Sequence, residues 1–233
     1  MVGAPVTLAG ALAELKENSG TAKHAQTGIW VAELLRRCII DGLLAPGTKL
    51  SEQSLGQVLG VSRNTLREAF TALHSERIVT RIPNRGVFVA RPSAADVREM
   101  YRVRRLLEPA ALQLPQRAAA PELAALAETV RLGRAGQAAA DVEGMAHANQ
   151  EFHRLVVSLA HSARLDALMA QVLAEMRLVF HAMSGEPAFH APFVDENARI
   201  LQLLAGGRRD EAAKEMGGYL GRAEHGLLRA LGA

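Results

Sequence analysis

The chain has 233 residues, of which 49% are hydrophobic, and it carries a formal net charge of +3 and a single cysteine, Cys38. No uninterrupted apolar run reaches the roughly 18–20 residues that cross a bilayer, and the first residues lack the basic start of a secretory signal peptide. One cysteine excludes an internal disulfide framework and a cysteine-rich zinc site. We therefore expect a cytoplasmic protein of one or two domains that makes no membrane contact.

The positive charge is unevenly distributed along the chain. Residues 1–92 contain 11 Lys and Arg against 7 Asp and Glu, whereas residues 93–233 contain 16 against 17. Residues 61–91 contain six arginines but only two acidic residues, Glu68 and Glu76. A local excess of this kind is typical of a surface that meets phosphate, although many globular proteins carry one without such a partner.

Residues 1–23 are predicted to be a tail, and helical periodicity runs from His24 to Asp41 through Ile29, Val31, Leu34, Leu35, Cys38 and Ile39. Ser51 and Ser62 are good N-cap residues for two further short helices, which Gly60 separates. The third helix is predicted to bury Leu66, Ala69, Phe70 and Leu73. Three short helices in this order predict a compact helical unit.

After Glu76 the apolar period changes from 3.6 to about two. Ile78, Thr80 and Ile82 alternate, the segment 83–86 turns, and the chain returns through Val87 and Val89. This pattern predicts a small β-hairpin with a basic tip. Three helices followed by a basic hairpin form the order of a winged helix-turn-helix, which we assign to residues 24–92.

The third helix carries the residue types that read DNA. If its four apolar residues face the core, the exposed face and the helix start carry Ser62, Arg63, Asn64, Thr65 and Arg67. Arg pairs with guanine, Asn pairs with adenine, and a hydroxyl at a helix N-terminus binds phosphate. The alternative is an ordinary solvated amphipathic helix.

Beyond Ala94 the sequence predicts six helices at about 94–118, 121–139, 141–160, 162–183, 192–205 and 208–231, with a loop over 184–192. Pro109 and Pro115 are expected to kink or split the first of them. The fold class is therefore mainly α. A winged helix-turn-helix with a small β-hairpin wing is followed at residues 93–233 by an all-α antiparallel helical bundle.

Residues 41–89 resemble the GntR family of bacterial repressors. The resemblance rests on a Gly-x-Leu-x-Pro-Gly turn, a Leu-x-Glu start to the second helix, the VSRNTLRE segment and an NRG wing tip. It implies operator contacts from Arg63, Asn64, Thr65 and Arg67, and a minor-groove approach by the wing at Arg85-Gly86. The chain departs from the family at Gln53, where the fatty-acid regulator has arginine, and at Arg77, where a glycine is usual.

Residues 94–230 are similar to the FCD effector domain of the family's FadR branch, through segments 101–112 and 149–160 and the final helix pair; six helices are typical of its VanR-like subgroup. Many such domains hold a divalent metal through one Asp and three His. The matching positions here are Asn149, His153, Asn197 and Tyr219. Because neutral amides and a phenol lack the charge and basicity of that ligand set, we predict no metal and no other cofactor.

These four residues, with Arg104, are predicted to form a polar pocket for a small organic effector, for which a carboxylate facing Arg104 is one expectation. The alternative is a structural core in which they satisfy one another and an ordered water.

Three functions are compared. The first is a ligand-responsive repressor that binds a palindromic double-stranded operator as a homodimer. The second is an enzyme using His153, but no nucleophile elbow, phosphate loop or catalytic carboxylate pair is visible, so we expect no enzymatic activity. The third is a constitutive dimeric DNA-binding protein whose helical domain has lost sensing.

Overall fold

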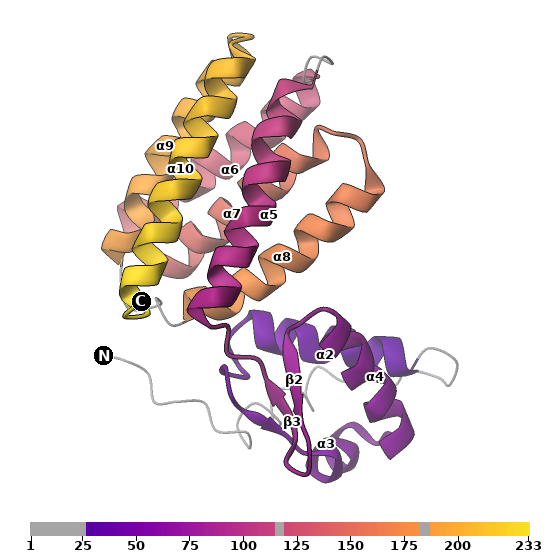
Figure 1. Cartoon of the computed structure of the whole chain (residues 1–233). Coiled ribbons are helices and arrows are strands. Elements are labelled where there is room, and N and C mark those ends of the chain that lie inside the picture. The colour runs from indigo at the N-terminus through magenta and orange to yellow at the C-terminus, as the bar shows by residue number, and fades with distance from the viewer. Residues whose placement is uncertain (1–26, 115–118, 182–186) are drawn as a thin grey trace. The chain divides into compact units, whose positions relative to one another are not determined.

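The computed structural model describes residues 27–114, 119–181 and 187–233, which form nine helices and one small antiparallel sheet (Figure 1). Its contacts divide the chain after Pro92 into an N-terminal and a C-terminal unit. The tail predicted for residues 1–23 and the predicted helix start at His24 lie outside the described residues. None of the described helices is long and apolar enough to cross a membrane.

The N-terminal unit contains α2 (Thr27–Ile40), α3 (Glu52–Leu59) and α4 (Arg63–Ser75). Ser51 caps α3 by accepting a hydrogen bond from the Ser54 N–H at 3.2 Å, and Gly60 ends it in a left-handed conformation with φ 67°. An ion pair at 2.6 Å between Arg36 Nε and Glu76 Oε2 links α2 to the end of α4. The predicted short helices and their caps are therefore present.

The sheet has one strand more than the predicted hairpin. Strands β2 (Val79–Ile82) and β3 (Gly86–Val89) pair antiparallel with Ile82 opposite Gly86, and β1 (Lys49–Leu50) pairs with the other edge of β3. A strand of two residues is too short for an alternating pattern to appear in the sequence. The wing is therefore fastened to the loop before α3, which brings Lys49 next to it.

One residue of the predicted first helix and one departure from the family pattern take a different role from the one expected. Ile29, placed on the apolar face of the first helix, is 65% exposed, because the buried face of α2 begins at Val31. Arg77, which replaces the usual glycine, adopts the left-handed conformation itself with φ 59°. Its N–H donates to the His74 carbonyl at 3.0 Å and the Ile78 N–H donates to the Leu73 carbonyl at 3.2 Å, so the turn into β2 forms in spite of the substitution.

The described residues of the C-terminal unit form six helices, as predicted: α5 (Ala94–Gln113), α6 (Ala120–Ala139), α7 (Val142–Ser158), α8 (Ala163–His181), α9 (Pro187–Ala205) and α10 (Arg209–Ala230). A capping box between Ser93 and Asp96 starts α5. Buried side chains from all six helices form the core, and Tyr101, Phe152 and Tyr219 are among the largest of them.

Prolines explain where two helix boundaries were wrong. Helix α5 runs through Pro109 and stops at Gln113, because Leu114 is extended with ψ 143°, as a residue before proline prefers. Helix α9 begins at Pro187, although a loop was predicted up to Pro192. Proline suits the first helical position. Buried His190, Phe193 and Val194 hold the next turns, so packing outweighs the hydrogen bond that Pro192 cannot donate.

The turn at Arg77 gives a stability prediction. A side chain in the left-handed region is strained relative to glycine, so Arg77→Gly should stabilise the N-terminal unit by about 0.5–1 kcal/mol. Calorimetric unfolding should show the rise. Arg77→Ala is the matched control, since it keeps the Cβ and should give no gain; equal stabilisation by both variants would contradict the role of backbone strain.

Candidate nucleic-acid interface and buried polar cluster

The start of α4 presents the residues that the sequence predicts to meet DNA. Leu66, Ala69, Phe70 and Leu73 are buried on one face of the helix. The opposite side therefore exposes Ser62, Arg63, Asn64 and Arg67, with Thr65 half-buried. Ser62 Oγ accepts a hydrogen bond from the Thr65 N–H at 3.1 Å and lies 2.9 Å from Thr65 Oγ1, so these two hydroxyls cap the helix.

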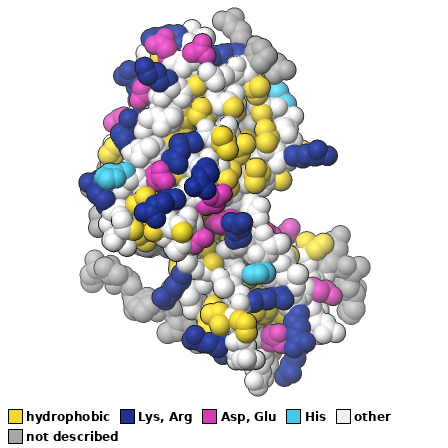
Figure 2. Space-filling model, in the orientation of Figure 1, with side chains coloured by type: hydrophobic (Ala, Val, Ile, Leu, Met, Phe, Trp, Pro, Cys, Tyr) yellow, Lys and Arg dark blue, Asp and Glu magenta, His cyan; other side chains and the backbone are white. Residues whose placement is uncertain are grey.

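The wing tip places cations around one aromatic ring. Asn84 and Gly86 have positive φ of 60° and 107°, which turns the chain between β2 and β3 and exposes Arg85. The Arg85 guanidinium carbon and Lys49 Nζ each lie 5.9 Å from the centre of the Phe88 ring. Figure 2 shows Lys and Arg side chains spread over the visible face of this unit. Lys49 was missed by sequence reasoning, because its position depends on the short strand β1.

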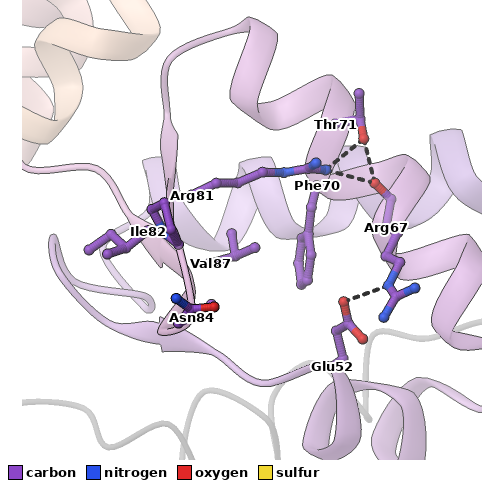
Figure 3. Close-up of a pocket in the computed structure, with 10 residues that line it drawn as sticks. Glu52, Arg67, Phe70, Thr71, Arg81, Ile82, Asn84 and Val87 are labelled. Atoms are coloured by element: carbon purple, nitrogen blue, oxygen red, sulfur yellow. Dashed lines mark hydrogen bonds and ion pairs between the residues drawn. The ribbon is translucent and has the colours of Figure 1, made fainter.

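A groove of about 390 Å³ lies between α4 and the wing (Figure 3). Its wall includes Arg81 of β2, whose Nη2 donates to Thr71 Oγ1 at 2.6 Å and to the Arg67 carbonyl at 3.2 Å. Across the groove, Arg67 Nε donates to Glu52 Oε1 at 3.0 Å. Sequence reasoning gave no role to Glu52, Thr71 or Arg81; only Glu52 stood out, as part of the Leu-x-Glu motif.

In the C-terminal unit, a buried ion pair within α5 is hydrogen-bonded to a histidine of α7. Arg104 Nε donates to Glu108 Oε1 at 2.6 Å, and the other carboxylate oxygen of Glu108 lies 2.6 Å from His153 Nδ1. All three side chains are at most 1% exposed. The Arg104 guanidinium also lies over the Tyr101 ring, 5.0 Å from its centre. Glu108, which sequence reasoning noted only as a family motif residue, therefore belongs to the site.

Asn149 connects two further helices to this group. Its Oδ1 accepts hydrogen bonds from Asn197 Nδ2 at 2.7 Å and from the Tyr219 hydroxyl at 2.8 Å. The Tyr219 ring meets the His153 ring with centres 4.8 Å apart. The structure thus brings together all five residues predicted for the effector pocket, from α5, α7, α9 and α10. We call them and Glu108 the polar cluster: Arg104, Glu108, Asn149, His153, Asn197 and Tyr219.

Charges within the polar cluster are balanced. Burial opposes the ionisation of Glu108, but the Arg104 charge and the hydrogen bonds to its carboxylate hold the pKa of Glu108 below its usual value. Burial lowers the pKa of His153 and raises that of Tyr219, so both stay neutral near pH 7. A neutral His153 donates through Nδ1–H to Glu108, which leaves Nε2 as an acceptor.

Three buried atoms of the polar cluster have no hydrogen-bond partner among the residues that the structure describes: Arg104 Nη2, His153 Nε2 and Asn197 Oδ1. One is a donor and two are acceptors. Because buried polar atoms are nearly always satisfied in folded proteins, the cluster retains capacity to bind a small polar group.

This donor set does not fit a transition metal. The Asn149 carboxamide oxygen already accepts two hydrogen bonds, and the Tyr219 hydroxyl is a neutral donor. Within the described part of the chain, no three His, Cys, Asp or Glu side chains gather in a way that could hold a metal ion. His153 alone supplies an imidazole, which is too few ligands for zinc or nickel.

Buried histidines make the stability of the C-terminal unit depend on pH. Burial lowers the pKa of His153, and burial with the Arg177 charge lowers that of His190 to about 4. Below about pH 6.5 the histidines of the unfolded chain therefore bind protons that the buried histidines of the folded chain do not bind, so folding becomes less favourable. We expect the melting temperature to fall by on the order of several degrees between pH 7 and pH 5.

The variants His153→Gln and His190→Phe should flatten this pH dependence when combined. The control His161→Gln changes a side chain that is 61% exposed and should leave the dependence as it is. Calorimetry over this pH range provides the measurement, and an unchanged slope in the double variant would contradict the assignment.

The two units match two family models. Residues 30–89 match the bacterial regulatory proteins of the gntR family, and residues 99–222 match the FCD domain. The gluconate operon transcriptional repressor of Bacillus licheniformis is 34% identical over 141 residues, and the HTH-type regulator YdhC of Bacillus subtilis is 29% identical over 140 residues. The matched segments cover 60% and 59% of this chain, and only 58% and 62% of those relatives.

A solved structure agrees over more of the chain. The putative transcriptional regulator GntR from Rhodococcus sp. RHA1 is 40% identical, covers 88% of this chain and 99% of its own, and superposes with a TM-score of 0.82. The E. coli protein McbR/YncC, 22% identical with a TM-score of 0.66 over 90% of this chain and 95% of its own, shares the fold. These relatives are transcriptional regulators rather than enzymes. The chain therefore belongs to the GntR family of DNA-binding transcriptional regulators, with a gntR-type winged helix followed by an FCD domain.

Proposed function

We propose that this regulator is a ligand-responsive repressor that binds a palindromic operator as a homodimer. The observation that carries the proposal is the set of exposed polar and basic side chains at the start of α4, next to the basic wing. This arrangement allows α4 to contact base edges in the major groove while Arg85 and Gly86 reach the minor groove. Repression is supported by the similarity to the gluconate operon transcriptional repressor of Bacillus licheniformis.

Dimerisation follows from the limited reach of one short helix. A single α4 contacts too few base pairs for useful specificity, so two copies related by a two-fold axis would read two half-sites. In the C-terminal unit, Leu106 of α5 is 70% exposed. Figure 2 shows hydrophobic side chains gathered on the visible face of this unit. Such exposed apolar surface supports a protein–protein contact.

The polar cluster is the proposed effector site. Its unsatisfied atoms would donate one hydrogen bond to the effector and accept two. Glu108 already balances the Arg104 charge, so a carboxylate would bring an uncompensated negative charge into a buried site. We therefore propose an uncharged polar effector in place of the carboxylate expected from the sequence. In the alternative, an ordered water satisfies the same atoms and the protein binds DNA constitutively.

Arg63→Ala should weaken binding to the operator roughly 10- to 100-fold, because one bidentate base contact is worth about 1–3 kcal/mol. Footprinting of the chain's own promoter region would locate the operator and show whether its half-sites are symmetric.

Arg131→Ala, which changes an exposed arginine of the C-terminal unit, is the control. Unchanged operator binding by Arg63→Ala would contradict DNA reading by α4, and a monomer by sedimentation on DNA would contradict the dimer.

An effector should raise the melting temperature because it binds the folded state alone. We expect such a shift from uncharged members of a panel that pairs C2–C6 carboxylates with the corresponding alcohols. His153→Gln should abolish the shift by removing the free imidazole nitrogen, whereas the exposed-site variant His161→Gln should keep it. Shifts from the carboxylates alone would contradict the charge argument, and no shift from any compound would favour constitutive binding.

A further inference from the structure

Arg67 is held at both ends in the groove between α4 and the wing (Figure 3). Its backbone carbonyl accepts hydrogen bonds from Thr71 Oγ1 at 2.7 Å and Arg81 Nη2 at 3.2 Å. Its side chain donates through Nε to Glu52 Oε1 at 3.0 Å. The Arg67 side chain is nevertheless 63% exposed, so the contact with Glu52 orients the guanidinium without burying it.

The contact with Glu52 decides which nitrogens of Arg67 remain for DNA. The hydrogen bond uses Nε, so the terminal nitrogens Nη1 and Nη2 form the end of the guanidinium that is left. A pair of parallel N–H groups matches the O6 and N7 acceptors of guanine in the major groove. A freely rotating arginine would instead present any of its five N–H groups to the nearest phosphate.

Glu52 also cancels the charge of Arg67 on the surface that faces DNA. Sequence-independent binding depends on cationic side chains that release counterions from phosphates. A carboxylate at 3.0 Å makes the pair formally neutral and repels phosphate oxygens. Recognition of a base depends on hydrogen-bond geometry rather than on net charge. The oriented Nη1 and Nη2 groups of Arg67 can therefore still bind guanine.

Helix stability alone is the competing explanation for Glu52. A carboxylate in the first turn of α3 interacts favourably with the helix dipole, and an exposed ion pair adds at most about 1 kcal/mol. That role would change the melting temperature slightly and leave the choice between DNA sequences unaffected. Discrimination and salt dependence therefore distinguish the two explanations.

We propose that Glu52 is a specificity-determining positioning residue: it orients Arg67 toward guanine and suppresses its binding to phosphate. The inference rests on the proposed reading of an operator by α4. In this role, the negative charge of Glu52 in α3 weakens binding to DNA of any sequence and strengthens the preference for the operator sequence.

The test compares the full-length protein and its variants on the footprinted operator duplex and on a scrambled duplex of equal composition, by fluorescence anisotropy at several salt concentrations. Glu52→Gln should raise affinity for the scrambled duplex several-fold and steepen the salt slope by roughly one. The ratio of operator to scrambled affinity should fall about ten-fold. Glu52→Asp, which keeps the charge but shortens the reach, should lower the ratio with an unchanged slope.

Two controls separate position from charge. Glu68→Gln removes an exposed carboxylate of α4 that lies toward Gly28 of α2, and it should lower the ratio far less than Glu52→Gln. In an Arg67→Ala background, Glu52→Gln should not lower the ratio further, because the residue it positions is gone.

The outcomes distinguish this inference from the proposed function. If the unaltered protein discriminates between the duplexes and Glu52→Gln keeps both its ratio and its salt slope, the role of Glu52 is wrong and the repressor proposal stands. If the unaltered protein does not discriminate, both are overturned. A change in melting temperature without a change in ratio would assign Glu52 to helix stability.

Discussion

Four buried side chains of α4 fix the rotation of this helix, and the geometry of the proposed DNA-binding surface depends on that constraint. Leu66, Ala69, Phe70 and Leu73 are each at most 1% exposed, so turning the helix would move apolar surface into water. The opposite face must therefore carry Arg63 and Arg67. Because Thr71 lies one turn beyond Arg67, the same rotation brings it within reach of Arg81 on the wing.

The wing is thereby coupled to α4 through polar contacts. Arg81 donates to both a side chain and a backbone carbonyl of α4, and β1 fastens the other edge of the sheet. Two elements that would enter adjacent grooves of DNA thus share one small framework. Such a framework orders its contacts before binding, which reduces the conformational entropy lost on association.

The C-terminal unit places a polar cluster inside an otherwise apolar core. Burying Arg104 and Glu108 is tolerable because each neutralises the other and His153 completes the chain. Asn149 satisfies two donors from different helices. Two nitrogens and one oxygen of the cluster have no partner among the described residues, so a small polar group or an ordered water can complete the network.

Much of the fold and part of the site could be predicted from local sequence signals. Caps at Ser51 and Ser62, the stop at Gly60 and the period change after Glu76 act over a few residues, and they located the helices and the hairpin. Local signals failed where packing outweighed them. Strand β1 exists because β3 supplies its hydrogen bonds, and α9 continues through Pro192 because its neighbours are buried.

The sequence by itself determined the family, the order of elements and the residue types at the start of α4, because these depend on periodicity and on short motifs. Only the tertiary structure decided which polar side chains meet. The pairs Glu52–Arg67 and Glu108–His153 are separated by 15 and 45 residues, and the pair Arg81–Thr71 joins a strand to a helix. Hydrogen bonds and ion pairs depend on distances of a few ångströms in space, and only the packing of the elements sets those distances.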